Sequence, residues 1–230
     1  MVISHAAPFL ESFETLNIID VGCNTGCFLR EVKPHLKQKS YWIGIDPTNH
    51  KVGDLYDIYL EKAISNVEKD EKAVFTEYND SGCNSLLDMN TDIITHDKKD
   101  KNEKWFIDRV IEEVVQKKEV TVTSLKSILN SIPKFNADVD NLIHYVKIDT
   151  QGNDINVVRS MGPYLNTTIF IQLECVTSHD PKKVLYKGQQ LLENDIDDMK
   201  LLGFSVVNIE DHSGFASPEG DVLFVNDKCL

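Results

Sequence analysis

Short runs of β-branched and other apolar residues alternate with helical patterns along most of the chain. Residues 16–21 (LNIIDV) and 41–46 (YWIGID) are nearly continuous apolar runs, as expected for strands that are buried on both faces. Their alternation with helices is typical of a mostly parallel α/β sheet, so we expect an α/β protein. The expected strands are residues 16–21, 41–46, 60–65 (the weakest), 73–78, 143–149, 168–174, 204–209 and 221–225.

The last two expected strands are joined by a link that is too short for a crossover helix, which makes them antiparallel. The sheet should therefore be mostly parallel, with an antiparallel strand near one edge. The alternating run at 73–78 is expected to pair with its neighbour as a hairpin. The expected helices are residues 25–32, ended or kinked by Pro34, residues 153–161, with Asn153 as N-cap, and residues 188–202, ended by Gly203.

The composition of the 230 residues, 41 % apolar and 27 % charged, is ordinary for a globular protein. We expect a single domain over 1–230, with residues 88–119 as a charged excursion from the sheet because 97–104 reads DKKDKNEK.

The charge balance argues against several classes of partner. A net charge of −13 disfavours nucleic acid, because phosphates repel a surface of this sign. No apolar run approaches the roughly 20 residues needed to cross a bilayer, and the first residues lack a secretory signal pattern. Five cysteines without a CxxC pair are typical of reduced thiols, which predicts a cytoplasmic location.

The segment 19–28 (IDVGCNTGCF) carries the strongest functional signal. An apolar strand ends in Asp20, a tight loop follows with Gly22 and Gly26, and a helix then begins. Such a loop allows close approach of the backbone to a ligand, and the helix offers free N–H groups. Asp46 ends the next strand, where an acid is placed to accept both hydroxyls of a ribose. The sequence thus predicts a nucleotide-type cradle.

Two classes of ligand are candidates for this cradle. A dinucleotide requires G-x-G-x-x-G, but Asn24 and Cys27 occupy the second and third glycine positions. S-adenosylmethionine has a ribose and an amino-acid tail but no pyrophosphate, and its cationic sulfonium suits acidic and apolar walls. A third interpretation has no ligand: Gly22 and Gly26 are plain turn glycines, and Asp46 is a helix cap ahead of Pro47.

Several motifs in a fixed order resemble one family. They are DVGCNTG (20–26), WIGIDP (42–47), EKAIS (61–65), NSL (84–86), VTVTSLKSIL (120–129), YVKIDTQGND (145–154) and IFIQLE (169–174). Together they resemble the FkbM-type S-adenosylmethionine-dependent methyltransferases over residues 17–174.

The resemblance implies a class I methyltransferase (Rossmann-like) fold: a seven-stranded, mostly parallel sheet with one antiparallel strand and helices on both faces. It also implies O-methylation of a hydroxyl on a sugar, glycolipid or secondary metabolite, with S-adenosyl-L-methionine as cofactor. The methionine portion would contact the loop, and the ribose would contact Asp46. The expected cofactor-binding residues are Asp20, Gly22, Cys23, Asn24, Gly26, Phe28, Asp46 and Ser65, with Asn84 and Ser85 also near the adenine.

A second group of acids ends the later strands on the same carboxyl edge. Asp149 is the first candidate for general base or for orienting the acceptor, and Glu174 is the second. Family members commonly have Glu where this chain has Gln151, which completes the predicted catalytic set. As alternatives, Asp149 would cap the following helix or bond the Gly152 turn, and Glu174 would pair with a surface lysine. Lys147 shares a face with Asp149 and is expected to neutralise an acid.

No metal site is expected, because the position of a third carboxylate holds Gln151 and no histidines have ligand spacing. His179 and His212 would either line an acceptor pocket or be solvated. Cys23 and Cys27 are expected to pack around the cofactor.

The leading hypothesis is a methyltransferase that acts on a small-molecule or glycan acceptor, with residues 88–119 helping to form the acceptor site. The alternatives are a non-catalytic protein that retains the fold and a nucleotide-dependent α/β enzyme. Neither the acceptor nor the oligomeric state follows from the sequence.

Overall fold

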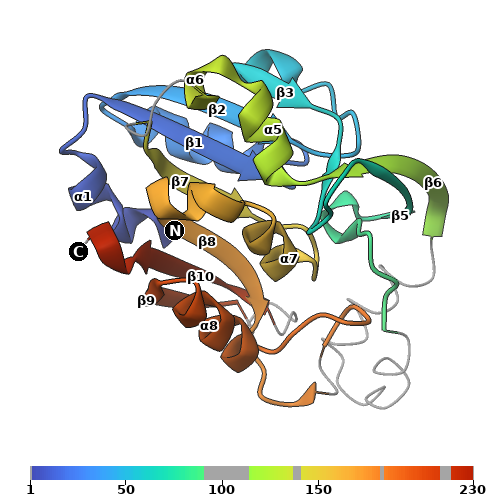
Figure 1. The fold of residues 1–230 in the computed structure, drawn as a ribbon. Helices are drawn as coiled ribbons and strands as arrows, with labels where there is room; N and C mark the ends of the chain where they lie inside the picture. Colours follow the sequence, from blue (N-terminus) through green and yellow to red (C-terminus); the bar gives the residue numbers. More distant parts are fainter. Residues whose placement is uncertain (1, 91–113, 137–140, 182–183, 213–218, 230) are drawn as a thin grey trace.

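A computed structural model describes residues 2–90, 114–136, 141–181, 184–212 and 219–229. A seven-stranded sheet dominates them, with the strand order β3-β2-β1-β7-β8-β10-β9 (Figure 1). Strands β3 to β8 in this order are parallel, and β10 is antiparallel to both β8 and β9. The expected α/β class and the antiparallel strand near one edge are confirmed. The strands of this sheet are β1 (Thr15–Val21), β2 (Lys39–Ile45), β3 (Ile58–Leu60), β7 (Ile143–Ile148), β8 (Thr168–Val176), β9 (Phe204–Asp211) and β10 (Glu219–Asn226).

Helices cover both faces of the sheet. Ile19 and Val21 of β1 belong to an apolar core shared with α5, α7 and α8, whereas Leu16 and Ile18 belong to a core shared with α1 and α2 on the other face. Because both faces are covered, the strands have nearly continuous apolar sequences. The helices are α1 (Ala7–Leu10), α2 (Cys27–Val32), α5 (Leu125–Ser131), α6 (Pro133–Asn136), α7 (Asp154–Arg159) and α8 (Leu192–Leu201), with 3-10 turns η1 (Val2–His5), η2 (Lys33–His35), η3 (Gly53–Leu55), η4 (Ser81–Cys83), η5 (Gly162–Thr167) and η8 (Asp227–Cys229).

Helix boundaries differ from the sequence-based expectation at two places. The helix expected from Thr25 begins at Cys27, because Gly26 has a left-handed φ of 76°. The helix expected from Gly188 begins at Leu192, since Gly188 also has a positive φ. Asn153 precedes α7 as expected, but its side chain makes no capping bond and instead donates to the Ile64 carbonyl. Among the described helices, none is long and apolar enough to cross a membrane.

A second, three-stranded sheet stands beside the main one, and its pairing was not expected. The predicted strand 60–65 is two strands: β3 ends in the main sheet at Leu60, and β4 (Ala63–Ile64) pairs with β6 (Val114–Thr123). The predicted hairpin at 73–78 was wrong in its partner. Strand β5 (Glu71–Tyr78) pairs antiparallel with β6, and only a single bridge joins Thr76 to Ser85. Of the predicted excursion, residues 91–113 lie outside the described part, and 114–119 belong to β6.

Candidate active site

The loop after β1 is shaped by its contact with the end of β7. Gly22, Asn24 and Gly26 all have positive φ angles, of 75°, 43° and 76°. A Cβ atom at Gly22 would lie 1.7 Å from the Asp149 carbonyl oxygen, because β1 and β7 are adjacent parallel strands that end side by side. Position 22 therefore requires glycine for close packing as well as for its backbone angle.

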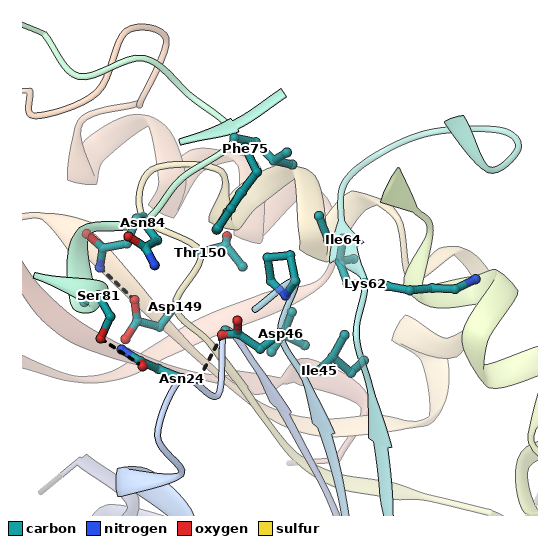
Figure 2. A pocket seen from close by; sticks show the side chains of 17 residues that line it. Asn24, Ile45, Asp46, Lys62, Ile64, Phe75, Ser81, Asn84, Asp149 and Thr150 are labelled. Carbon is teal, nitrogen blue, oxygen red and sulfur yellow. Dashed lines mark hydrogen bonds between the residues drawn. The ribbon is translucent and has the colours of Figure 1, made fainter. Parts of the chain in front are cut away.

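A pocket opens at the carboxyl edge of the sheet, beside the loops that follow β1, β2 and β7 (Figure 2). The space between its walls is about 560 Å³ when the open mouth is included. Figure 2 shows Ile45 and Ile64 on one side of Asp46, and Asn24 and Ser81 on the other. Five residues of the predicted site line this pocket: Gly22, Asn24, Asp46, Asp149 and Gln151.

Asp46 is held by backbone groups from two loops. Its Oδ2 accepts a hydrogen bond of 2.9 Å from the Asn24 N–H, and its Oδ1 accepts one of 2.8 Å from the Thr48 N–H. Burial raises the pKa of Asp46, although these two hydrogen bonds and His50 oppose the rise. Each carboxylate oxygen has a second lone pair, so Asp46 can accept two further bonds from the hydroxyls of a ligand in the pocket.

Asp20 lies behind the loop and is fully buried, outside the pocket lining. Its Oδ2 accepts a hydrogen bond of 2.8 Å from the Tyr56 hydroxyl, and its Oδ1 has no partner within the described structure. Burial raises the pKa of Asp20 to about 6, against the lowering effects of Lys147 and Tyr56. Glycine at position 44 makes this contact possible, because a Cβ there would lie 2.7 Å from the Tyr56 ring.

Asp149, Gln151 and Glu174 form one connected group at the carboxyl edge of the sheet. The Gln151 amide donates to Asp149 Oδ1 at 2.8 Å and also to Glu174. Its carbonyl oxygen lies 2.8 Å from the Tyr186 hydroxyl. Lys147 Nζ lies 2.7 Å from Asp149 Oδ2, so the expectation that this lysine neutralises an acid is confirmed.

The pKa values of the two carboxyl groups in this cluster are shifted in opposite directions. Burial raises the pKa of Glu174 well above its usual value, and the charges of Asp149 and Glu219 add to the rise. Burial also acts on Asp149, but Lys147 and the hydrogen bonds from Lys147 and Gln151 outweigh it and lower the pKa of Asp149. The arrangement therefore favours a proton on Glu174 over a proton on Asp149.

The backbone turn at Gly152, which was an alternative hydrogen-bond partner for Asp149, is bound by Asp154 instead. Its two carboxylate oxygens accept hydrogen bonds from the N–H groups of Thr150 and Gly152, at 2.9 and 3.1 Å. The turn before α7 is therefore closed by Asp154, and Asp149 is left to face the pocket.

The other predicted cofactor residues lie outside the pocket lining. Cys23 is buried in the core on the α2 side, where burial raises the pKa of its thiol. Phe28 packs in the same core, with its ring centre 5.9 Å from those of Trp42 and Tyr145. Ser65 contacts Asn153, at 3.3 Å between the two side chains. Gly26 contributes the turn into α2.

The motif NSL reaches the pocket in part: Asn84 lines it, whereas the Ser85 hydroxyl donates to the backbone carbonyl of Gln151. His179 is solvated beside Glu193, and His212 lies 3.8 Å from Asp221. Neither histidine lines the pocket. In the described part of the chain, no three His, Cys, Asp or Glu side chains are grouped to hold a metal ion.

Sequence reasoning missed several residues that build the site. Tyr56 and Tyr186 hold Asp20 and Gln151, and Ser81 and Phe75 line the pocket. The signal for Tyr56 was the glycine at position 44 in a buried strand, since such a glycine marks the close approach of another group. The remaining three depend on contacts between distant segments.

The order of the strands, the antiparallel β10, the helices on both faces and the pocket at the carboxyl edge together define the class I methyltransferase fold. The expected fold class is thus confirmed.

Comparisons with solved structures return methyltransferases at low identity. The magnesium protoporphyrin IX methyltransferase of Synechocystis PCC 6803, solved with bound SAM, is 10 % identical, with a TM-score of 0.44 over 98 % of this chain and 78 % of that one. A putative rRNA methylase from Clostridium thermocellum is 10 % identical, with a TM-score of 0.41 over 97 % and 96 %. A SAM-dependent methyltransferase from Aquifex aeolicus is 11 % identical, with a TM-score of 0.39 over 96 % and 88 %. Neither a scan against family models nor a search of curated proteins finds a match, and FkbM membership stays a prediction.

Proposed function

We propose that the protein is an S-adenosylmethionine-dependent methyltransferase that transfers the methyl group to a hydroxyl oxygen. The observation that carries this proposal is the position of Asp46, held by two backbone N–H groups at the pocket wall beside the glycine loop. An acid that ends the second strand beside such a loop is placed to bind a ribose diol.

The residues of the pocket fit the chemistry of this cofactor. Asp46 would bind the ribose, and the apolar side chains that line the pocket, Ile45, Ile64 and Phe75, would pack against the adenine (Figure 2). The loop 22–26 would face the cationic methionine end, and the buried carboxyl group of Asp20 lies behind this loop. The Asn24 side chain stands where a dinucleotide-binding loop needs glycine, which disfavours the dinucleotide hypothesis.

The acidic cluster supports the transfer step. S-adenosylmethionine supplies an electrophilic methyl group, and an acceptor hydroxyl must be aligned with it and lose its proton. Asp149, charged and fixed by Lys147 and Gln151, would orient the hydroxyl and accept this proton as the carbon–oxygen bond forms and the carbon–sulfur bond breaks. All polar atoms of the Gln151 side chain are engaged by protein partners, so we assign Gln151 a positioning role.

We propose a neutral, hydroxylated acceptor such as a sugar, a glycolipid or a secondary metabolite, as the FkbM resemblance implies. The acceptor side of the pocket carries Asn24, Ser81 and Asn84, whose amide and hydroxyl groups both donate and accept hydrogen bonds. Lys62 is the one cationic side chain among the described lining residues, and the chain has a net charge of −13. Both features disfavour a nucleic-acid acceptor.

A second candidate function is a non-catalytic protein that binds the cofactor. It is favoured by Gln151, an amide at the position where the related family commonly has a carboxylate, because an amide cannot accept a proton in catalysis.

Two measurements test these functions. Calorimetry with S-adenosylhomocysteine and with NAD is expected to show binding of the first ligand only. Transfer of a labelled methyl group from S-adenosylmethionine to a panel of saccharides and glycolipids is expected to show a product that base does not hydrolyse, as an ether requires. Binding without transfer to any acceptor would support the non-catalytic function, and absence of S-adenosylhomocysteine binding would exclude both.

A further inference from the structure

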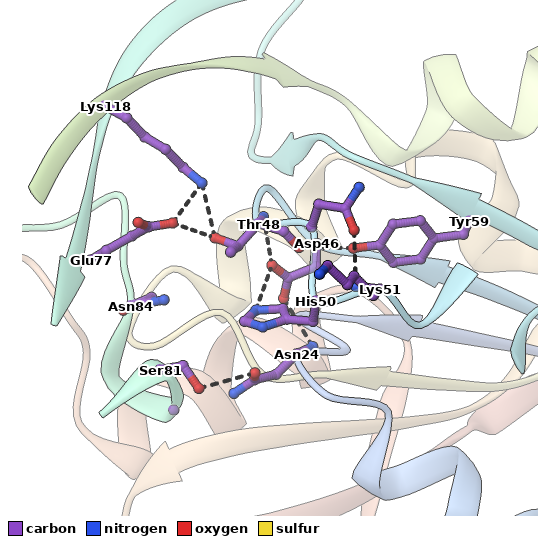
Figure 3. A network of polar contacts seen from close by, with 12 residues as sticks. Asn24, Asp46, Thr48, His50, Lys51, Tyr59, Glu77, Ser81, Asn84 and Lys118 are labelled. Carbon is purple, nitrogen blue, oxygen red and sulfur yellow. Dashed lines mark hydrogen bonds and ion pairs between the residues drawn. The ribbon is translucent and has the colours of Figure 1, made fainter. Parts of the chain in front are cut away.

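A network of charged and polar side chains connects the second sheet to the loop that follows β2 (Figure 3). The Thr48 hydroxyl donates to Glu77 Oε1 at 2.7 Å, and Lys118 contacts both of these residues. Glu77 belongs to β5 and Lys118 to β6. Neither residue lines the pocket, so the function proposed above gives them no role.

The network acts on the two loops that hold Asp46. One loop contributes the N–H of Thr48, and the other contributes the N–H of Asn24. The side chain of each of these residues is held in turn by the segment 77–81: Thr48 by Glu77 at 2.7 Å, and Asn24 by the Ser81 hydroxyl at 3.1 Å. Segment 77–81 is thus connected to Asp46 in two ways, through Thr48 and through Asn24.

Glu77 is fixed strongly enough to act as an anchor. It is only 8 % exposed, and its second oxygen accepts a hydrogen bond from Gln116, its partner across the β5–β6 pair. Burial would raise the pKa of Glu77, but hydrogen bonds from Lys118, Gln116 and Thr48 outweigh it and lower the pKa to about 2. Glu77 therefore stays charged at physiological pH, and its bond from Thr48 is a charge-assisted one.

We infer that Glu77 of β5 and Ser81 of the following turn η4 are positioning residues for Asp46. Through them, the second sheet and this turn set how much more strongly the pocket binds a ligand with a ribose diol than a ligand without these hydroxyls. This inference rests on the proposed function. The physical reason is that two loops must stay in register for the Asp46 carboxylate to present its free lone pairs to both hydroxyls. Each tether removes freedom from one loop before the ligand arrives, and such preorganisation increases affinity.

The test compares two ligands and matched variants. Dissociation constants are measured by calorimetry for S-adenosylhomocysteine and for its 2′,3′-dideoxyribose counterpart. Thr48→Val removes the hydroxyl that bonds to Glu77 with little change in shape, and Thr48→Ser restores a hydroxyl. Ser81→Ala removes the other tether. Thr121→Val is the matched control, because Thr121 lies on β6 and its hydroxyl contacts Lys72 instead of the pocket loops.

We expect Thr48→Val and Ser81→Ala each to weaken binding of S-adenosylhomocysteine about threefold to tenfold, as for the loss of one hydrogen bond. Binding of the dideoxy ligand should change less than twofold in both variants. Thr48→Ser and Thr121→Val should bind both ligands as the wild type does. The two tethers act on different loops, so if one variant does not fold, the other still gives the answer.

A purely structural role would weaken both ligands by the same factor, and this result would overturn the inference, as would unchanged affinity for S-adenosylhomocysteine. In both cases the wild type still binds S-adenosylhomocysteine, and the proposed function stands. If the wild type binds neither ligand, the proposed function fails and the inference fails with it.

Discussion

The contact between the Gly22 loop and the end of β7 can be tested with two glycine substitutions. A Cβ at position 22 would lie 1.7 Å from the Asp149 carbonyl oxygen, whereas a Cβ at Gly188 would meet nothing within 4 Å. Both residues have positive φ, of 75° and 89°. The backbone penalty of an L-residue, about 1–2 kcal/mol, is thus common to Gly22→Ala and Gly188→Ala, and only the first adds a clash with a backbone atom.

The clash cannot be relieved by a side-chain rotation, because the atom that is met is a backbone oxygen, that of Asp149 directly after β7. The strand end or the loop must move by more than an ångström, and overpacking of this kind typically costs about 1–3 kcal/mol. We therefore expect Gly188→Ala to lower the free energy of unfolding by about 1–2 kcal/mol and Gly22→Ala to lower it by about 2–5 kcal/mol.

Urea denaturation followed by circular dichroism measures both values, and calorimetry with S-adenosylhomocysteine measures the effect on the pocket. Because Gly22 lines the pocket and Gly188 does not, only Gly22→Ala should also weaken ligand binding when the protein is folded. If Gly22→Ala destabilises the protein no more than Gly188→Ala, the packing of the loop against β7 is not as described.

Three further predictions concern the acids of the site. Asp46→Ala should weaken binding of S-adenosylhomocysteine by about 1.5–3 kcal/mol, as for a charge-assisted partner, and an unchanged dissociation constant would refute its placement at the ribose. Asp149→Asn should reduce turnover in the labelled-methyl assay about a hundredfold or more with little change in cofactor affinity; equal losses of both would argue against a catalytic role. Burial raises the pKa of Asp20 from 3.8 to about 6, so the folded protein binds a proton that the unfolded chain releases, and stability should fall as the pH rises from about 4 to about 6. Asp20→Asn should reduce this fall by about 2–3 kcal/mol in urea denaturation across this pH range, and an unchanged pH slope would contradict the burial of a protonated acid.

Much of the main sheet was predictable because its strands are buried on both faces. The runs at 16–21 and 41–46 show this burial in their sequence, and the short link before 221–225 reveals the antiparallel pair. The second sheet was not predictable in the same way. Strand β5 pairs with β6 across the intervening residues 79–113, and local periodicity contains no information about so distant a partner.

The residues of the candidate site also divide into those that local sequence predicts and those that it does not. Asp46 and Asp149 were found because the carboxyl ends of parallel strands converge at one edge. Lys147 was paired with Asp149 because residues two apart on a strand share a face. Tyr186 and Glu77 have no such local pattern, and they reach the site from separate segments.

By itself, the sequence determined the layers of the fold, the glycine loop and the acids at the strand ends, because periodicity and chain direction act over a few residues. Only the tertiary structure decided which of these acids is charged, which faces the pocket and which lies behind it. Asp20 and Asp46 lie near the ends of neighbouring strands in similar sequence contexts. Asp20 is nevertheless buried and bound by the Tyr56 hydroxyl, whereas Asp46 faces the pocket and is bound by N–H groups of two loops. Burial and hydrogen bonding are properties of the assembled neighbourhood, and they decide the chemistry of each carboxylate.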